Sequence, residues 1–180
     1  NTDKAQVYGA EFEIRRNLGF IGGDSWEDLS FNLNFSVIRS ELKMSEAEYE
    51  RRLLSARDGE TISDRREMQG QSPYLVNFGF NYANDDNGWQ SSLYYNVQGK
   101  TLQVVGTGDV PDAYTIPFHS LDFILNKSFG EDNNSNISFK VKNLLDSQRE
   151  VRYQSYQAED QIFSSFSPGR GISLGYTYRF

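Results

Sequence analysis

The sequence predicts an all-β fold, namely a section of an antiparallel transmembrane β-barrel with about seven strands. Three observations lead to this prediction. Polar and apolar residues alternate in seven segments, short and long links alternate between these segments, and aromatic residues make up 14% of the 180 residues. No apolar run approaches the roughly 18 residues of a membrane helix, so a helical membrane protein is excluded. A barrel is compatible with this polar composition, because only every second residue of its strands faces lipid.

Composition also limits the classes of function. The formal net charge of −7 argues against a nucleic-acid partner, because binding to phosphates requires a basic surface. The chain has no cysteine, which excludes a disulfide framework and a thiolate metal site. We therefore expect no nucleic-acid partner, no metal and no cofactor.

The strand predictions follow from alternation at a period of two residues. The seven segments cover residues 4–16, 28–42, 73–84, 88–99, 119–129, 136–145 and 171–180. Each has about the 9–11 residues with which a tilted strand crosses a bilayer. A soluble sandwich also alternates, so the content of the two faces decides between the two folds. Polar residues at mid-strand suit a wet lumen, and aromatic residues near strand ends with aliphatic ones between them suit a membrane girdle.

The two faces give two sets of candidate residues. The apolar face is predicted to contact outer-membrane lipid through Phe12, Leu33, Phe35, Phe78, Phe80, Leu93, Tyr95, Phe123 and Leu125. The polar face is predicted to line the lumen with Glu11, Glu13, Asn34, Asn77, Asn96, Asp122 and Lys140.

Three polar residues fall on the apolar register. Arg39 and Lys127 lie near strand ends, where a cation costs roughly 0–1 kcal/mol. Asn143 lies near the end of the sixth segment. Either that strand leaves the membrane at Asn143, or a bulge reverses its register.

The links between the segments differ in length. Those at 84–88 and 130–134 are short, whereas those at 43–71, 100–118 and 146–170 are long. In outer-membrane barrels short turns are periplasmic and long loops extracellular, and we expect the same here. The link at 17–27 is longer than the other predicted periplasmic turns. Within the first long link, residues 45–56 are predicted to form an exposed helix capped by Ser45.

The last segment carries the most specific pattern. It places apolar or aromatic residues at every second position, at Ile172, Leu174, Tyr176, Tyr178 and Phe180. This is similar to the carboxyl-terminal signature of bacterial outer-membrane proteins, which the barrel assembly machinery recognises. The first residues contain no Met and no signal-peptide pattern, and are interpreted as a cut or processed end.

Several short sequences, taken in order, resemble the last third of a TonB-dependent outer-membrane receptor of the Bacteroidetes type. They lie at residues 4–13, 68–77, 94–99, 121–122, 142–146 and 178–180. The resemblance implies that residues 1–180 are the carboxyl-terminal section of a plugged barrel of the 22-stranded type. It implies a transporter, not an enzyme, that imports a scarce ligand with energy from the TonB system. The plug and the segment that contacts TonB are expected in a missing amino-terminal part.

Other readings remain open. A small barrel of about eight strands with a structural or adhesive role also fits the length, as does a barrel client captured with an assembly or secretion machine. Local motifs add little: His119 has no second His or Cys as a metal partner, and Asp85 and Asp86 lack the spacing of a calcium loop. The aromatic segment 149–166 could bind a ligand or pack against another loop.

Overall fold

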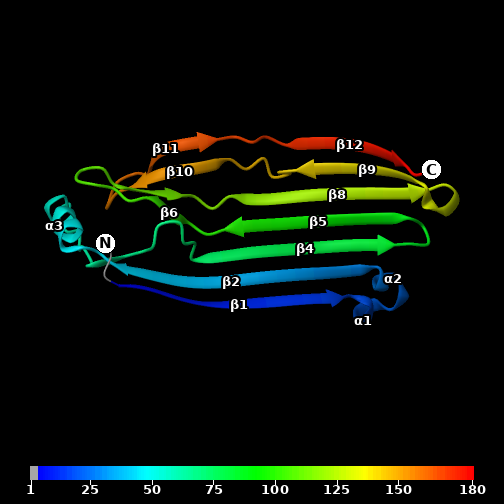
Figure 1. Cartoon of the computed structure of the whole chain (residues 1–180), viewed down its shortest axis with the longest axis horizontal. Coiled ribbons are helices and arrows are strands. Elements are labelled where there is room, and N and C mark those ends of the chain that lie inside the picture. The colour runs from blue at the N-terminus through cyan, green and yellow to red at the C-terminus, as the bar shows by residue number, and fades with distance from the viewer. Residues whose placement is uncertain (1–3) are drawn as a thin grey trace.

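The computed structural model describes residues 4–180, except for the side chains of residues 24 and 25. Its largest element is a sheet, here called the main sheet, whose strands follow each other in sequence order (Figure 1). The strands are β1 (Ala5–Asn17), β2 (Leu29–Lys43), β4 (Tyr74–Asn84), β5 (Trp89–Gln98), β8 (His119–Phe129), β9 (Ser135–Lys142) and β12 (Gly171–Tyr178). Each pairs antiparallel with the next, so the predicted all-β antiparallel fold is confirmed.

The register of the main sheet contains no bulge in any of these six strand pairs. Because side chains alternate between the two faces, an unbroken register keeps each residue class on one face across the whole sheet. Strands β1 and β12 are the two edges, and they do not pair with each other in the described part of the chain. The sheet is therefore open.

Two strands end earlier than predicted. The sixth segment was expected to reach residue 145, but β9 ends at Lys142. Asn143 follows with a backbone φ of 51°, which turns the chain away from the strand direction. Its backbone N–H donates to the Asp122 carboxylate at 3.0 Å instead of extending the ladder. The N–H of the next residue, Leu144, still donates to the carbonyl oxygen of Leu121 on β8 at 2.7 Å, so the regular ladder ends at Lys142 and one irregular bond to β8 follows. The last strand also ends early, at Tyr178 rather than at residue 180.

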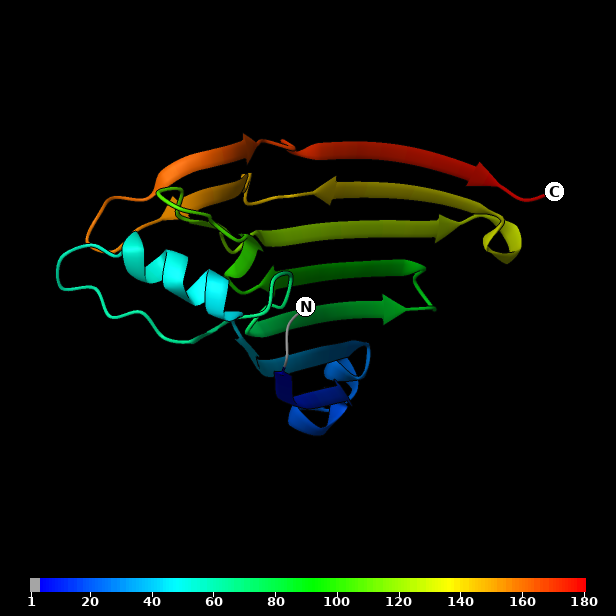
Figure 2. The ribbon, with the colours of Figure 1, turned by 60° about the vertical axis from the view of Figure 1, so that its left-hand side comes forward.

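The long links are structured, and apart from the helix in the first link the sequence patterns do not indicate this. They contribute a second sheet, here called the rim sheet, in the order β11 (Gln161–Phe166), β10 (Arg149–Gln154), β7 (Asp112–Thr115) and β6 (Thr101–Val104). The first long link adds the two-residue strand β3 (Arg65–Arg66) to β2 and forms helix α3 (Glu46–Leu54). The predicted cap of α3 is confirmed, since Ser45 Oγ accepts from the N–H of Glu48 at 3.2 Å. Figure 2 shows α3 and the rim sheet together at one end, here called the long-link end.

The opposite, short-link end carries only compact turns. They include the helical turns α1 (Gly19–Gly22) and α2 (Asp24–Glu27) and the 3-10 turn η1 (Glu131–Asn133). Gly88 closes the β4–β5 turn with φ 65°, and a Cβ there would collide with the carbonyl oxygen of Ser128. Glycine is needed at this position because it adopts positive φ without a steric penalty.

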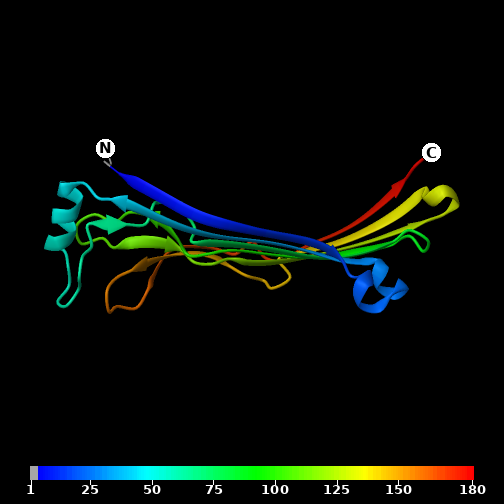
Figure 3. The ribbon, with the colours of Figure 1, turned by 90° about the horizontal axis from the view of Figure 1, so that it is seen from below.

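Buried apolar residues are few and lie mostly at the long-link end. Among the described residues they are Leu18, Leu42, Met44, Val97, Leu102 and Ala113. Seen along its edge in Figure 3, the main sheet is a single curved layer. A soluble sandwich would place a second layer over the apolar face to form a core. Within residues 4–180 the middle of the sheet has no such cover.

Candidate functional site

All nine residues predicted to face lipid lie on one face of the main sheet. The cross-strand register runs from Phe12 to Phe35, and in the next row from Leu33 through Phe78 to Tyr95. The remaining members, Phe80, Leu93, Phe123 and Leu125, follow in adjacent rows of the same face. Phe12 is 56% exposed and Leu174 on β12 is 76% exposed. An apolar face of this extent is typical of a surface that contacts another apolar phase.

Aromatic residues are spread more widely on this face than predicted. Phe78 and Phe123 occupy central rows, so the expected aliphatic middle is mixed. At the short-link end, Trp89 and Tyr176 do form an aromatic border. Lys127 lies among them, with Nζ 5.0 Å from the centre of the Trp89 ring. This cation–π contact explains how Lys127 is accommodated on the apolar register.

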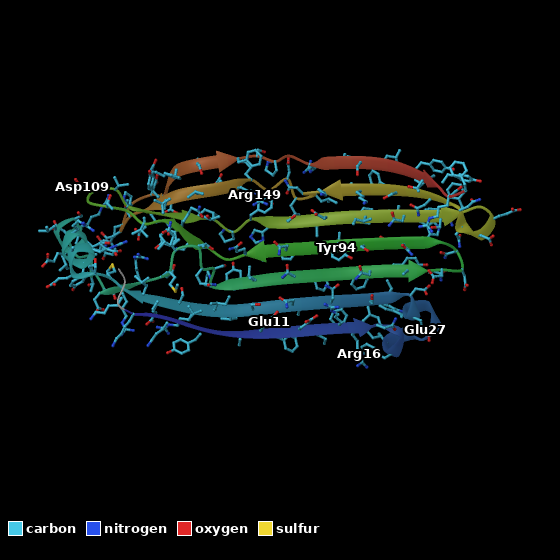
Figure 4. The ribbon with its side chains drawn as sticks, in the orientation of Figure 1. Glu11, Arg16, Glu27, Tyr94, Asp109 and Arg149 are labelled. Atoms are coloured by element: carbon cyan, nitrogen blue, oxygen red, sulfur yellow. The ribbon has the colours of Figure 1, made fainter. Side chains whose placement is uncertain are left out.

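All seven residues predicted to line the lumen lie on the opposite face, where they form a polar network. Asn34 donates to Glu11, and Asn96 donates to Asn77. Tyr94 Oη donates to Asn81 at 2.9 Å. Figure 4 shows Glu11 on β1 and Tyr94 on β5, so this network extends across four strands, from β1 to β5. The remaining predicted members, Glu13, Asp122 and Lys140, share this face by register.

The charged groups of the polar face are not arranged for catalysis. Glu13 pairs with Arg15 at 2.7 Å, and Glu11 accepts from an amide. General acid–base chemistry requires convergent carboxyl groups with separated roles, and these two are held by different partners. His119 is bound to Tyr95 through an Nδ1···Oη contact of 2.6 Å. In residues 4–180 no cluster of three or more His, Cys, Asp or Glu could hold a metal ion, and no helix is long and apolar enough to cross a membrane.

The three long links are joined by charged contacts and by strand pairing. Arg52 of α3 donates to both carboxylate oxygens of Asp112 on β7, at 2.8 and 3.1 Å. Burial disfavours the charged form of Arg52, but the bonds to Asp112 outweigh it and raise the pKa of Arg52. The same helix presents Glu48, which Arg66 reaches at 2.7 Å. Strand β10 of the third link pairs with β7 of the second.

A polar cavity of about 570 Å³ lies between α3 and these strands. Charged and aromatic side chains line it, among them Arg57, Glu60, Asp109, Tyr114 and Tyr156. Figure 4 shows Asp109 at the long-link end, far from Arg16 and Glu27. The mixture of both charge signs with tyrosine hydroxyls suits a polar ligand that offers donors and acceptors.

Tyr114 gives this region a pH dependence. Burial raises its pKa to about 12, and the charge of Asp112 adds to the shift. Because this exceeds the unfolded value of about 10, the protonated phenol stabilises the fold fully below about pH 10, and the contribution is lost as the pH rises through about 12. We expect Tyr114→Phe to lose less stability than wild type over this range, as measured by urea unfolding at each pH. Identical profiles for the two proteins would contradict the assignment.

The chain was compared with known proteins. The β-barrel model of the TonB-dependent receptor-like family matches residues 1–144, which is most of the chain. The chain belongs to the TonB-dependent receptor family. Comparison with curated proteins gave no match, and neither did comparison with solved structures.

Membership confirms the predicted resemblance to a TonB-dependent receptor barrel and assigns the chain to receptor-type transport at the bacterial outer membrane. The family is one of transporters, which agrees with the expectation that the protein is not an enzyme. Sequence reasoning did not identify the Arg52–Asp112 pair of this receptor barrel, because the two residues are 60 positions apart and neither belongs to a motif. Asn143 did give a signal, as a polar residue on an apolar register.

Proposed function

We propose that this chain is the carboxyl-terminal barrel section of a Bacteroidetes-type TonB-dependent receptor that imports a scarce ligand. The observation that carries the proposal is an uncovered main sheet with one apolar and one polar face, joined to structured links at one end only. The complete barrel is of the 22-stranded, plugged type. Its plug and its TonB-contacting segment belong to parts of the receptor outside these residues.

In this proposal the apolar face, with Leu33 and Phe78, contacts outer-membrane lipid, and the polar face, with Glu11 and Asn77, lines the lumen. The alternation of the two faces supports this orientation, because the polar network would be costly in hydrocarbon. The long-link end is extracellular, and the short-link end is periplasmic. The cavity beside Tyr114 and Tyr156 is then placed where an incoming ligand first meets the receptor.

Strand β12 is proposed to carry the signal for the barrel assembly machinery. It is an edge strand with an exposed apolar face, in which Ile172, Leu174 and Tyr176 are 69, 76 and 62% exposed. Tyr178 and Phe180 continue the same alternation. An extended edge with unpaired backbone groups can add a strand of another protein.

The two alternatives differ from this proposal at the sheet edges. A small closed barrel would pair its first strand with its last, whereas β1 and β12 lie at opposite edges in the described chain. A captured client would have a foreign strand on one of these edges. The open edges therefore favour a larger barrel, or a partner that supplies strands, over a small closed one.

The orientation can be tested with single cysteines, because the chain has none of its own. Asp109→Cys probes the long-link end, and Asp86→Cys probes the β4–β5 turn at the short-link end. Both are introduced into the full-length receptor in intact cells. A membrane-impermeant maleimide is expected to label only the first, since the second faces the periplasm.

Permeabilising the outer membrane provides the control, because both cysteines must then react. Labelling of Asp86→Cys but not of Asp109→Cys in intact cells would invert the proposed topology. Equal labelling of both in intact cells would argue against insertion in the outer membrane.

A further inference from the structure

A group of cations lies at the long-link end of the apolar face. Lys43 at the end of β2 is the direct cross-strand partner of Arg65 on β3. On its other side, the N–H of Lys43 donates to the carbonyl oxygen of Lys4 at 2.9 Å. Three cations therefore stand side by side on neighbouring chain segments. Arg39 lies four residues before Lys43 on β2, so by alternation it shares the face of Lys43.

A single carboxylate is placed among these four cations. Glu41 binds Arg39 at 2.6 Å and Arg65 at 3.0 Å, one with each oxygen. Among the described residues the group thus has an excess of positive charge, although the whole chain carries −7. Like charges on directly opposed strand positions are destabilising. An anion bound between them would remove this repulsion.

The position of this cation group indicates which anion it meets. On the same face of β2, the cation group comes directly after the apolar residues Phe35 and Val37, whose side chains are 39 and 47% exposed. Arg39 lies two residues, about 7 Å, beyond Val37. In a membrane the layer directly beyond the hydrocarbon is that of the lipid headgroups. Long cationic side chains reach this layer from neighbouring depths.

There is also space beside the group. A cavity of about 710 Å³ opens between the end of β2 and the segment that contains β3. Arg39, Glu41 and Arg65 line it from the cation group. Arg66 and Arg52 line its inner side together with Asp112, and they are held by Glu48 and Asp112, so the guanidinium groups that face the apolar side are those of Arg39 and Arg65. Guanidinium groups bind phosphate oxygens in bidentate geometry. A headgroup phosphate could thus be held at the mouth of this cavity while its acyl chains follow the apolar face.

We propose that Lys4, Arg39, Lys43 and Arg65 form a binding site for the phosphate of an anionic lipid in the outer leaflet. This inference rests on the proposed function, because it requires the apolar face to contact lipid and the long-link end to be extracellular. Continuity with the apolar face distinguishes a lipid from free phosphate, which would gain nothing from Phe35 and Val37.

The test compares two double variants of the full-length receptor. Lys43→Gln/Arg65→Gln removes two exposed cations from the group, and Lys140→Gln/Lys142→Gln removes two exposed cations from the polar face. Each receptor is purified in a neutral detergent, and phosphatidic acid is titrated in while bound lipid is counted by native mass spectrometry. One cation near an anionic lipid surface contributes about a fivefold change in affinity, so the first variant is expected to bind about 25-fold more weakly. The second variant is expected to bind like wild type.

Phosphatidylcholine and inorganic phosphate complete the experiment. Wild type is expected to prefer phosphatidic acid to phosphatidylcholine, and inorganic phosphate is expected not to displace the bound lipid. Equal losses in the two double variants, no loss in the first, or displacement by inorganic phosphate would overturn the site. A separate measurement asks whether wild type inserts into phosphatidylcholine vesicles. Failure to insert would contradict the proposed function itself, whereas insertion without phosphate preference contradicts only this inference.

Discussion

Leu33→Arg is expected to remove most of the receptor from the outer membrane, whereas Asn34→Arg is expected to be tolerated. Leu33 lies in a central row between Ile14 and Phe78 on the apolar face. An arginine at the bilayer midplane costs about 2–4 kcal/mol. That is a large part of the roughly 5–15 kcal/mol by which proteins are stable.

The neighbouring position provides the matched control, because the two substitutions differ only in the face that receives the charge. Asn34 stands opposite Glu13 and Asn77, and it already donates to Glu11. A guanidinium there would meet two carboxylates and solvent. Receptor levels in outer-membrane fractions and the free energy of unfolding in vesicles measure both effects. Equal losses for the two variants would mean that the assignment of the faces is wrong.

The second large effect is expected at Asn143, which is 6% exposed. Its Nδ2 donates to the carbonyls of Ser147 at 3.1 Å and Gly169 at 3.0 Å, and its Oδ1 accepts from the Ser147 N–H at 3.0 Å. Asn143→Ala would take these partners from three part-buried backbone groups, and an unsatisfied group costs about 1–3 kcal/mol when it is fully buried. It would also place alanine at a positive φ, which asparagine tolerates better. We expect a loss of about 3–5 kcal/mol in the free energy of unfolding.

Asn136→Ala serves as the comparison, because Asn136 lies within β9 and donates only to the Ser128 hydroxyl at 3.1 Å. Its removal is expected to cost about 1 kcal/mol. Urea unfolding of both variants in the same detergent gives the two values. A cost for Asn143→Ala no larger than for Asn136→Ala would show that Asn143 does not stabilise the segments that lead into β10 and β12.

The strands of the main sheet could be predicted because each has two chemically different faces. The polarity of a side chain, as in Leu33 and Asn34, indicates which face of the sheet the residue occupies. Alternation of polarity therefore predicts both the strand and its two faces. The capping serine of α3 is a similarly local signal, since Ser45 and Glu48 are three residues apart.

The rim sheet could not be predicted in the same way. Strands β6 and β7 have four residues each, too few for alternation to be distinguished from chance. Their stability depends on partners distant in sequence, such as the pairing of Thr115 with Val151. The cavity beside Tyr114 depends on the same long-range contacts. Reading a single segment at a time cannot find a site of this kind.

The bulge-free register of the main sheet has a geometric consequence for the whole barrel. Asn17, the last residue of β1, lies in the same cross-strand row as Ser173, and β12 continues five residues farther, to Tyr178. At the other end, Ile172, the second residue of β12, shares a row with Arg16, which is eleven residues beyond the start of β1.

The ends of β12 are thus shifted towards the short-link end relative to the ends of β1. Averaged over the six steps from β1 to β12, this shift is a little more than one residue per step. With about 3.4 Å per residue and about 4.8 Å between strands, the strands are inclined by about 40° to the barrel axis. Residues at equal depth in the bilayer therefore do not share a cross-strand row. They advance by about one residue towards the short-link end from each strand to the next, along a spiral around the barrel wall.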